Sequence, residues 1–259
     1  MKSRFWQWVT LAVTFVGIVL PQFLLGDHFN LGRDASVAFV PAGYAFSIWG
    51  VIYLGFLLFA VHQALPSQRD NPRYATLRPW MMVTAGLNFL WLMLAISSLS
   101  WLWATVPVIA VMLAVALRQH RALRVTQPPS SGMEAFLRVP FSLYLGWLTV
   151  AVIANVSTVL PKYGVDRLVL GAGAWAVLLI GVGSAIGLAV RFGLNDRVYA
   201  AVFVWAFAAI AVRQWETFPV VATSAVIAAI VFFVTVVMPT STALTAQVPW
   251  MRRARNAEK

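Results

Sequence analysis

The chain contains no cysteine. This absence excludes disulfides, thiolate metal sites, catalysis by a cysteine thiolate and lipidation at cysteine. Histidine is almost as scarce, since only His28, His62 and His120 occur, and they are scattered along the chain without metal-ligand spacing. We therefore expect no metal site built from protein ligands, and cysteine usage gives no indication of the redox compartment.

Charged residues are also few. They make up 10% of the chain, whereas about a quarter is usual in a globular domain. Hydrophobic residues account for 61%, and the mean hydropathy is +0.81. This composition indicates an integral membrane protein. The 12 Trp and 17 Phe exceed what aromatic belts at the membrane surface alone would need, so some of these rings serve the interior.

Apolar segments of the length that crosses a bilayer recur along the whole chain. Every Asp, Glu, Lys and Arg falls between them or at their ends, as expected because charge is costly in hydrocarbon. The sequence therefore predicts an all-α polytopic membrane protein with about eight transmembrane helices. The predicted spans are 5–25, 39–64, 80–96, 101–117, 139–160, 168–190, 198–212 and 218–238, of which 198–212 is the shortest.

The first of these segments follows Lys2 and Arg4, which also suits a secretory signal peptide. Its apolar stretch is longer than a typical signal h-region, and no small-x-small cleavage site closes it. We expect a retained helix.

The basic residues are distributed unequally between the two sides of the membrane. Eight spans place both termini on one side, where 15 of the 19 Lys and Arg lie, and Arg33, Lys162, Arg167 and Arg213 lie on the other. Such an asymmetry indicates cytoplasmic termini. The net charge of +11 is then a topology signal, so no nucleic-acid partner is expected. We expect a multi-pass protein of a bacterial inner (cytoplasmic) membrane, with the lipid bilayer as its surroundings.

Three helix faces combine aromatic rings with a polar group. Trp49 and Tyr53 are four residues apart, and Asn88 and Trp91 are three apart, so each pair shares one face of a helix. For the rings, lipid, core and ligand contacts all remain open. An Asn in hydrocarbon needs a partner, which is either a neighbouring helix or a carbonyl or carboxylate of a ligand.

The third of these faces is the longest. Tyr144, Trp147, Ala151 and Asn155 follow one another at spacings of 3, 4 and 4. Two large rings, a small residue and an amide suit a cavity wall better than a lipid-facing surface, because Ala151 leaves room beside Trp147. The sequence thus contains candidate ligand-binding residues on three helices.

No predicted span contains an acid, a base or an activated nucleophile, so no catalytic residues and no metal ligands are assigned. His62 lies at a cytoplasmic helix end, where it suits the negative end of the helix dipole. Without a buried carboxylate, ion-coupled transport is disfavoured.

Three motifs in order resemble the tryptophan-rich sensory protein and translocator protein family (TspO/MBR). That family has a second-helix pattern Pro-Pro-x-Trp-x-Phe-x-Pro-Val-Trp-x-x-x-Tyr, and "PAGYAFSIWGVIY" keeps Pro41, an aromatic cluster, Trp49 and Tyr53. It departs at Ser47, where the family has Pro. The third-helix pattern Leu-Asn-x-x-Trp is matched by "LNFLW", and the fifth-helix pattern by Tyr144, Leu145, Trp147 and Asn155.

The resemblance covers about residues 5–160 and implies a five-helix bundle. It leaves three further predicted helices without a counterpart. We therefore divide the chain into a TspO/MBR-like five-helix bundle at 1–165, three additional transmembrane helices at 166–240, and a basic cytoplasmic tail at 241–259. The added part is rich in small residues, and its Gly183-x-x-x-Gly187 motif is a candidate surface for a homodimer. The acidic residue usual on the fourth helix of the family is missing.

The family resemblance also implies a pocket for porphyrins and other flat hydrophobic ligands. By position, it would be lined by Trp49, Tyr53, Asn88, Trp91, Tyr144, Trp147, Ala151 and Asn155. Residues 26–40, which include His28, Arg33 and Asp34, would be its lid. No intrinsic cofactor is expected, but a porphyrin or haem is expected as a ligand, and sterol-like molecules also fit. The leading hypothesis is a binding or sensory protein; the alternatives are a porphyrin-degrading membrane enzyme and a facilitative transporter of small hydrophobic molecules.

Overall fold

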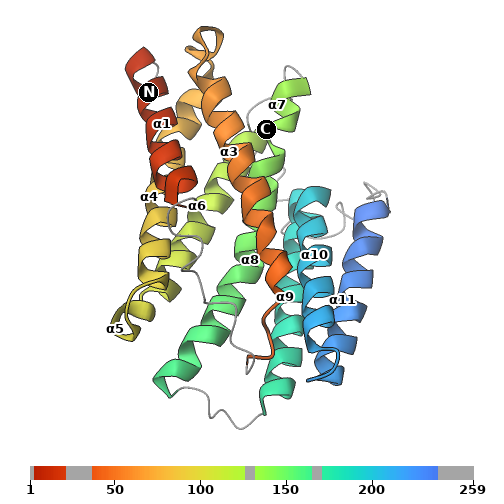
Figure 1. Ribbon diagram of the computed structural model, residues 1–259. Helices are drawn as coiled ribbons and strands as arrows, with labels where there is room; N and C mark the ends of the chain where they lie inside the picture. The colour runs from red at the N-terminus through yellow and green to blue at the C-terminus, as the bar shows by residue number, and fades with distance from the viewer. Residues whose placement is uncertain (1–2, 22–36, 126–131, 165–170, 239–259) are drawn as a thin grey trace. The chain divides into compact units, whose positions relative to one another are not determined.

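The computed structural model describes residues 3–21, 37–125, 132–164 and 171–238. All regular secondary structure within these ranges is helical, which confirms the all-α prediction (Figure 1). The predicted tail at 241–259 lies outside the described residues.

The chain forms two compact units. Unit 1 comprises Met1–Ala35 and Phe46–Asp166, and unit 2 comprises Ser36–Ala45 and Arg167–Lys259. The helices of unit 1 are α1 (Arg4–Thr14) with the π-helical η1 (Phe15–Val19), α3 (Ile48–Ala64), α4 (Pro72–Ala95), α5 (Leu99–Leu102), α6 (Thr105–Val125), α7 (Gly132–Phe136) and α8 (Val139–Val159), and the short 3-10 helices η4 (Pro66–Gln68) and η5 (Leu160–Tyr163). Unit 2 contains α9 (Ala172–Leu194), α10 (Arg197–Gln214) and α11 (Pro219–Val237). The 3-10 helix η3 (Gly43–Ser47) is divided: residues 43–45 belong to unit 2 and residues 46–47 to unit 1.

Each of the eight predicted spans corresponds to a helix. Six helical stretches are long and apolar enough to cross a membrane: Gly43–Ala64, Leu99–Leu123, Val139–Tyr163, Ala172–Leu194, Arg197–Gln214 and Pro219–Val237. The short predicted span 198–212 is therefore part of a helix of sufficient length. The apolar helix Arg4–Val19 is shorter, and α4 is not among the six.

Close approach between helices of unit 1 depends on glycine. In this unit α1 packs on α3 and α4, α4 on α6, α6 on α8, and α8 on α3. A Cβ atom added at Gly55 of α3 would lie 2.4 Å from Cγ of Pro140 on α8, which is closer than any real contact. Glycine at this position therefore sets the distance between the two helices that carry most of the predicted site.

A buried polar cluster holds one end of unit 1. The side-chain amides of Gln7 and Gln63 each donate to the other residue's backbone carbonyl, at 2.7 and 2.9 Å, and Arg78 Nε donates to Gln63 Oε1 at 2.8 Å. Arg78 also donates to carbonyls of the loop between α3 and α4. His62 Nδ1 lies 3.0 Å from the hydroxyl of Tyr74. These bonds satisfy a fully buried guanidinium and fix the connection into α4.

Unit 2 is built on a stack of phenylalanine rings. Phe203 of α10 and Phe232 of α11 lie parallel, with centroids 4.5 Å apart. A Cβ atom at Gly187 of α9 would lie 2.6 Å from Phe232 and 2.7 Å from Phe203. Both glycines of the Gly183-x-x-x-Gly187 motif are buried, and Gly187 helps to pack α9 inside unit 2. The homodimer expected from this motif stays a prediction.

Residues 37–45 belong to unit 2 because α10 binds their backbone. The amide of Ala42 donates to the carbonyl of Ala209 at 3.0 Å, and Trp205 Nε1 donates to the carbonyl of Ala45 at 3.0 Å. Gln214 Nε2 donates to the carbonyl of Val37 at 3.3 Å. The chain segment that leads into α3 is therefore held by α10.

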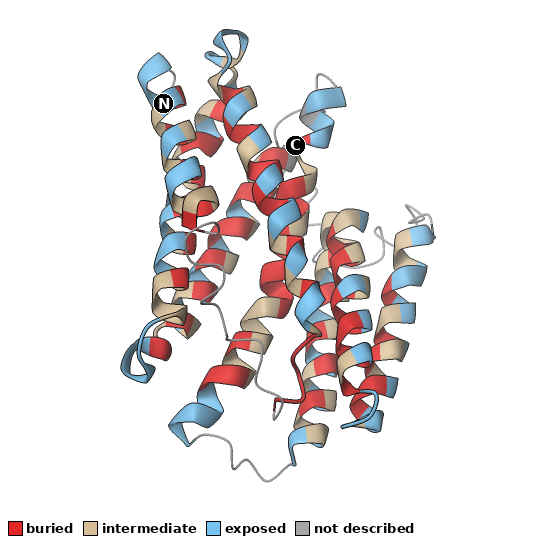
Figure 2. Cartoon of the chain, viewed as in Figure 1, coloured by how far each residue is buried: buried red, intermediate tan, exposed pale blue. Residues whose placement is uncertain are grey.

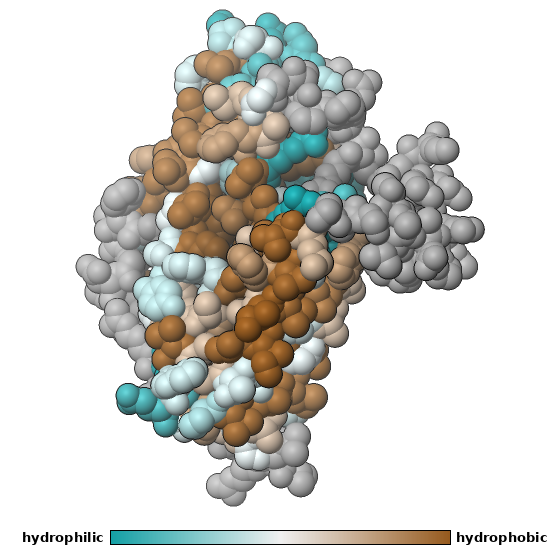
Figure 3. Space-filling model, turned by 90° about the vertical axis from the view of Figure 1, so that its right-hand side faces the viewer, coloured by the Kyte–Doolittle hydropathy of each residue, from teal (hydrophilic) through white to brown (hydrophobic). Residues whose placement is uncertain are grey.

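The distribution of buried and apolar side chains fits a membrane protein. Buried residues are densest on α8 in unit 1 and on α10 in unit 2 (Figure 2). On the face shown in Figure 3, hydrophobic side chains form a broad band. The exposed large side chains of α11 include Ile227, Ile230 and Phe233. Such a surface is stable when it faces lipid.

Candidate functional site

Rings from three helices of unit 1 meet around Trp49. On α3, Trp49 stacks on Tyr53 with centroids 5.2 Å apart and planes inclined by 24°. Trp91 of α4 lies 6.5 Å from Trp49, and Tyr144 and Trp147 of α8 lie 6.2 and 6.1 Å from it. These separations are typical of favourable aromatic pairs. We call these five residues and Asn88 the Trp49 cluster; it contains six of the eight predicted site residues.

Asn88 is the polar centre of the Trp49 cluster. Its Oδ1 accepts from the hydroxyl of Tyr53 at 3.1 Å, and its Nδ2 donates to the hydroxyl of Tyr144 and to the carbonyl of Thr84, both at 2.8 Å. Both N–H donors of the amide are thus used within the protein. Asn88 links α3, α4 and α8 and orients two rings, so its partners are neighbouring helices.

Trp147 contributes a buried donor. Its side chain is only 2% exposed, and its Nε1 has no hydrogen-bond partner within the described residues. A buried N–H without an acceptor carries a desolvation cost, so such groups call for an explanation. By contrast, Trp49 and Trp91 are only half-buried. The cluster therefore combines two half-buried indoles, Trp49 and Trp91, with the buried donor of Trp147.

The other two predicted residues lie further along α8. Ala151 is half-buried, one turn beyond Trp147. Asn155 is two turns beyond Trp147, and its Oδ1 accepts from the hydroxyl of Thr105 on α6 at 3.2 Å. The structure does not place Asn155 with the Trp49 cluster, because α8 packs against both α3 and α6 and Asn155 is bonded to α6.

Three further rings extend the cluster and were not among the predicted site residues. Phe46 lies edge-on to Trp147 at 5.7 Å, and Phe56 lies 5.1 Å from both Tyr144 and Phe141. Phe56 follows Tyr53 by three residues, and Phe141 precedes Tyr144 by three. Phe56 and Phe141 could therefore have been predicted from their helical spacing to Tyr53 and Tyr144.

Other residues singled out in the sequence do not belong to the Trp49 cluster. Tyr44 belongs to unit 2, where it packs edge-on against Trp205 at 5.4 Å. The predicted lid residues His28, Arg33 and Asp34 lie outside the described residues. Among the residues that are described, no group of three or more His, Cys, Asp or Glu side chains could hold a metal ion.

Comparison with known proteins identifies one family. A family model described as TSPO-like protein matches residues 4–238. This match includes α9, α10 and α11, which the resemblance to the five-helix family left without a counterpart. No curated protein and no solved structure matches the chain. Since the family model covers nearly all of the sequence, the chain belongs to the family of TSPO-like proteins and is an integral membrane protein.

Proposed function

We propose that this protein binds a planar hydrophobic ligand at the Trp49 cluster and acts as a membrane sensor for it. The first candidate is a tetrapyrrole, a porphyrin or haem, and sterol-like molecules are the second. The observation that carries the proposal is the buried Nε1 of Trp147, which has no hydrogen-bond partner within the described residues and belongs to a cluster of aromatic rings from three helices. Flat apolar molecules stack on indole faces, and an acceptor on the ligand edge satisfies the buried donor.

Each residue of the Trp49 cluster has a defined part in this proposal. Trp49 and Trp91, which are half-buried, are the rings that a ligand reaches first. Asn88 keeps Tyr53 and Tyr144 in position. Outside the cluster, the short side chain of Ala151 leaves space beside Trp147, and Asn155 lies further along α8, where it is bonded to Thr105 of α6. A ligand that separates the Trp49 ring from its neighbours changes the packing of α3 on α8, which is a route from binding to a signal.

The test is a titration of the purified protein with protoporphyrin, followed by porphyrin absorbance and tryptophan quenching. Trp147→Phe keeps an aromatic ring but removes the donor, and one lost hydrogen bond should weaken binding about two- to tenfold. Trp101→Phe is the matched control, because Trp101 is 60% exposed on α5. Equal affinities for the wild type, Trp147→Phe and Trp49→Phe would contradict the site assignment.

Two further measurements separate binding from the alternative activities. If the protein only binds its ligand, illumination of the porphyrin complex yields no ligand-derived product beyond that seen without protein. Liposomes with and without the protein then also take up porphyrin equally. A protein-dependent product indicates an enzyme, and protein-dependent uptake indicates a transporter.

The membrane orientation is a second part of the proposal. We place both termini in the cytoplasm of a bacterium and the helices in its inner membrane, because 15 of the 19 Lys and Arg fall on the side of the termini. A reporter fusion at residue 259 should give a cytoplasmic signal, and a fusion in the connection at 160–170 should give a periplasmic one. Fusions that report the same side would refute this topology.

A further inference from the structure

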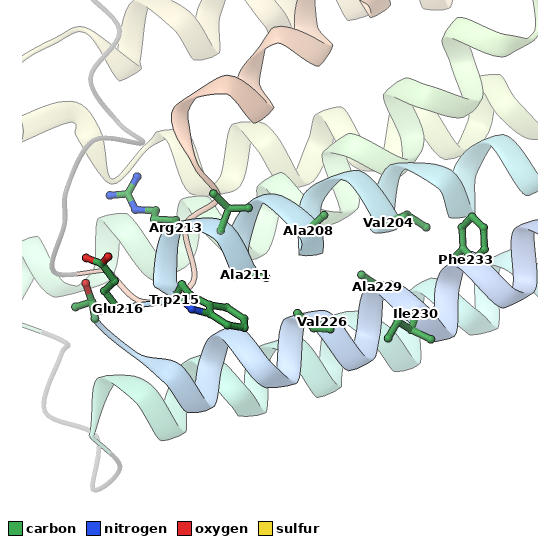
Figure 4. Close-up of a pocket in the computed structure, with 12 residues that line it drawn as sticks. Val204, Ala208, Ala211, Arg213, Trp215, Glu216, Val226, Ala229, Ile230 and Phe233 are labelled. Carbon is green, nitrogen blue, oxygen red and sulfur yellow. The ribbon is translucent and has the colours of Figure 1, made fainter.

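A groove of about 890 Å³ lies between α10 and α11 in unit 2 (Figure 4). Alanines at 208, 211 and 229 line it, and their short side chains create the hollow. The rings of Trp215 and Phe233 stand near its two ends. Its volume is within the roughly 300–1,000 Å³ that is usual for small-molecule sites. None of its lining residues belongs to the Trp49 cluster.

The length and chemistry of the groove fit a lipid tail. Its lining runs along α10 from Val204 to Arg213, and the nine helical steps between these two residues extend about 14 Å. This is close to half of the roughly 30 Å hydrocarbon core, or one leaflet. Both helices are candidate membrane spans, and the apolar wall residues Val212, Ile230 and Phe233 are exposed. The groove is therefore apolar, lies on a surface that faces lipid, and is about as long as one leaflet is thick.

One end of the groove is polar. Arg213, Glu216 and Thr217 line it there, at the junction where α10 ends and α11 begins, and the guanidinium and carboxylate lie at the same end (Figure 4). Arg213 also donates to the carbonyl of Pro41 at 3.4 Å, which helps to hold it at this end. Trp215 is exposed beside them, as tryptophans at membrane surfaces are. A cation and an anion thus stand where a lipid headgroup would lie.

We propose that this groove binds one zwitterionic phospholipid with a primary-amine headgroup, such as phosphatidylethanolamine. The acyl chain lies over the alanines, the phosphate meets Arg213, and the ammonium donates to the carboxylate of Glu216. A choline headgroup has no N–H to donate, and an anionic lipid or a dicarboxylate porphyrin would bring like charge to Glu216. The pair of opposite charges therefore selects the amine lipid.

The experiment measures lipid binding to the delipidated full chain by native mass spectrometry. The probes are phosphatidylethanolamine, phosphatidylcholine and phosphatidylglycerol with identical acyl chains. Ala208→Leu fills the groove, and Ala185→Leu is its control, because Ala185 is also an exposed helical alanine but does not line the groove. Glu216→Gln removes the carboxylate, and Asp70→Asn is the control for loss of an exposed acid in unit 1.

The wild type should bind phosphatidylethanolamine about tenfold more tightly than phosphatidylcholine, the value of one charge-assisted hydrogen bond. Ala208→Leu should weaken binding of all three lipids, and Glu216→Gln should abolish the preference for the amine while leaving tail binding intact. Equal affinity of the wild type for the three lipids, or tightest binding of phosphatidylglycerol, would overturn the headgroup assignment. Identical behaviour of Ala208→Leu and Ala185→Leu, or displacement of the lipid by protoporphyrin, would overturn the groove as a lipid site.

Should Ala208→Leu unfold, Glu216→Gln still decides the proposal. The side chain of Glu216 is exposed, so its replacement by an amide of the same size leaves packing unchanged. Retention of the full amine preference in Glu216→Gln would then be sufficient to reject the site.

Discussion

Replacement of Asn88 by Ala tests the hydrogen-bond geometry of the Trp49 cluster most directly. The side chain makes one hydrogen bond to Tyr53 on α3 and one to Tyr144 on α8. Both bonds cross between helices, and all three residues are buried. Asn88→Ala removes both bonds and leaves two hydroxyl groups without these partners.

The expected loss of stability follows from the number of bonds. Hydrogen bonds between helices in membrane proteins contribute about 0.6 kcal/mol on average and about 1.7 kcal/mol at most. Loss of two such bonds should therefore lower the free energy of unfolding by about 1 to 3 kcal/mol. The bond from Asn88 to the carbonyl of Thr84 lies within α4 and adds little to stability. In a membrane helix the backbone of the helix itself already satisfies that carbonyl.

The assay is reversible unfolding of the purified protein in mixed micelles, by titration with denaturing detergent. A double-mutant cycle pairs Asn88→Ala with Tyr53→Phe, and the coupling energy should be about 0.6 to 1.7 kcal/mol. A second cycle pairs Asn155→Ala with Tyr53→Phe and should give no coupling, because Asn155 is bonded to Thr105 of α6 instead.

A coupling energy of zero between Asn88 and Tyr53 would refute the hydrogen-bond assignment. If the coupling energy between Asn155 and Tyr53 were as large as that between Asn88 and Tyr53, the substitutions would act through the whole bundle rather than through one bond. Porphyrin affinity gives an independent readout. Asn88→Ala should weaken binding because Tyr53 and Tyr144 lose their common support, even though Asn88 uses both of its donors within the protein.

Two glycine substitutions test the helix contacts, each with a control on its own helix. Gly55→Ala should destabilise unit 1 by about 1 to 3 kcal/mol, because the new methyl group meets Pro140, whereas Gly50→Ala should be tolerated because nothing lies within 4 Å. Gly187→Ala should destabilise unit 2 by a similar amount through overlap with the phenylalanine stack, and Gly181→Ala should not. Unfolding midpoints check both pairs, and equal values within a pair would show that the backbones can move apart.

Local periodicity explains why much of the site could be predicted from the sequence. Trp49 and Tyr53 share a face by their spacing of four, and Tyr144 and Trp147 share one by their spacing of three. An amide such as Asn88 in an apolar helix needs a partner, either a neighbouring helix or a ligand, and the structure shows that its partners are Tyr53 and Tyr144 of the neighbouring helices. Where each residue lies on one helix face and that face meets one neighbour, spacing alone identifies the residues that come together.

The same reasoning fails where a helix has two neighbours. The stripe from Tyr144 to Asn155 is continuous on α8, but α8 packs on α3 and on α6. Asn155 therefore bonds to α6, while Trp147 meets the rings of α3. A pattern within one helix cannot state which neighbour each turn will meet, because that depends on the crossing of the helices.

The placement of residues 37–45 follows from contacts that no local pattern contains. Three of their polar backbone groups are bonded by α10, at least 160 residues later in the chain, through Trp205, Gln214 and the carbonyl of Ala209. Buried backbone groups need such partners. Residues 37–45 are therefore part of unit 2, although they precede α3 directly in the sequence.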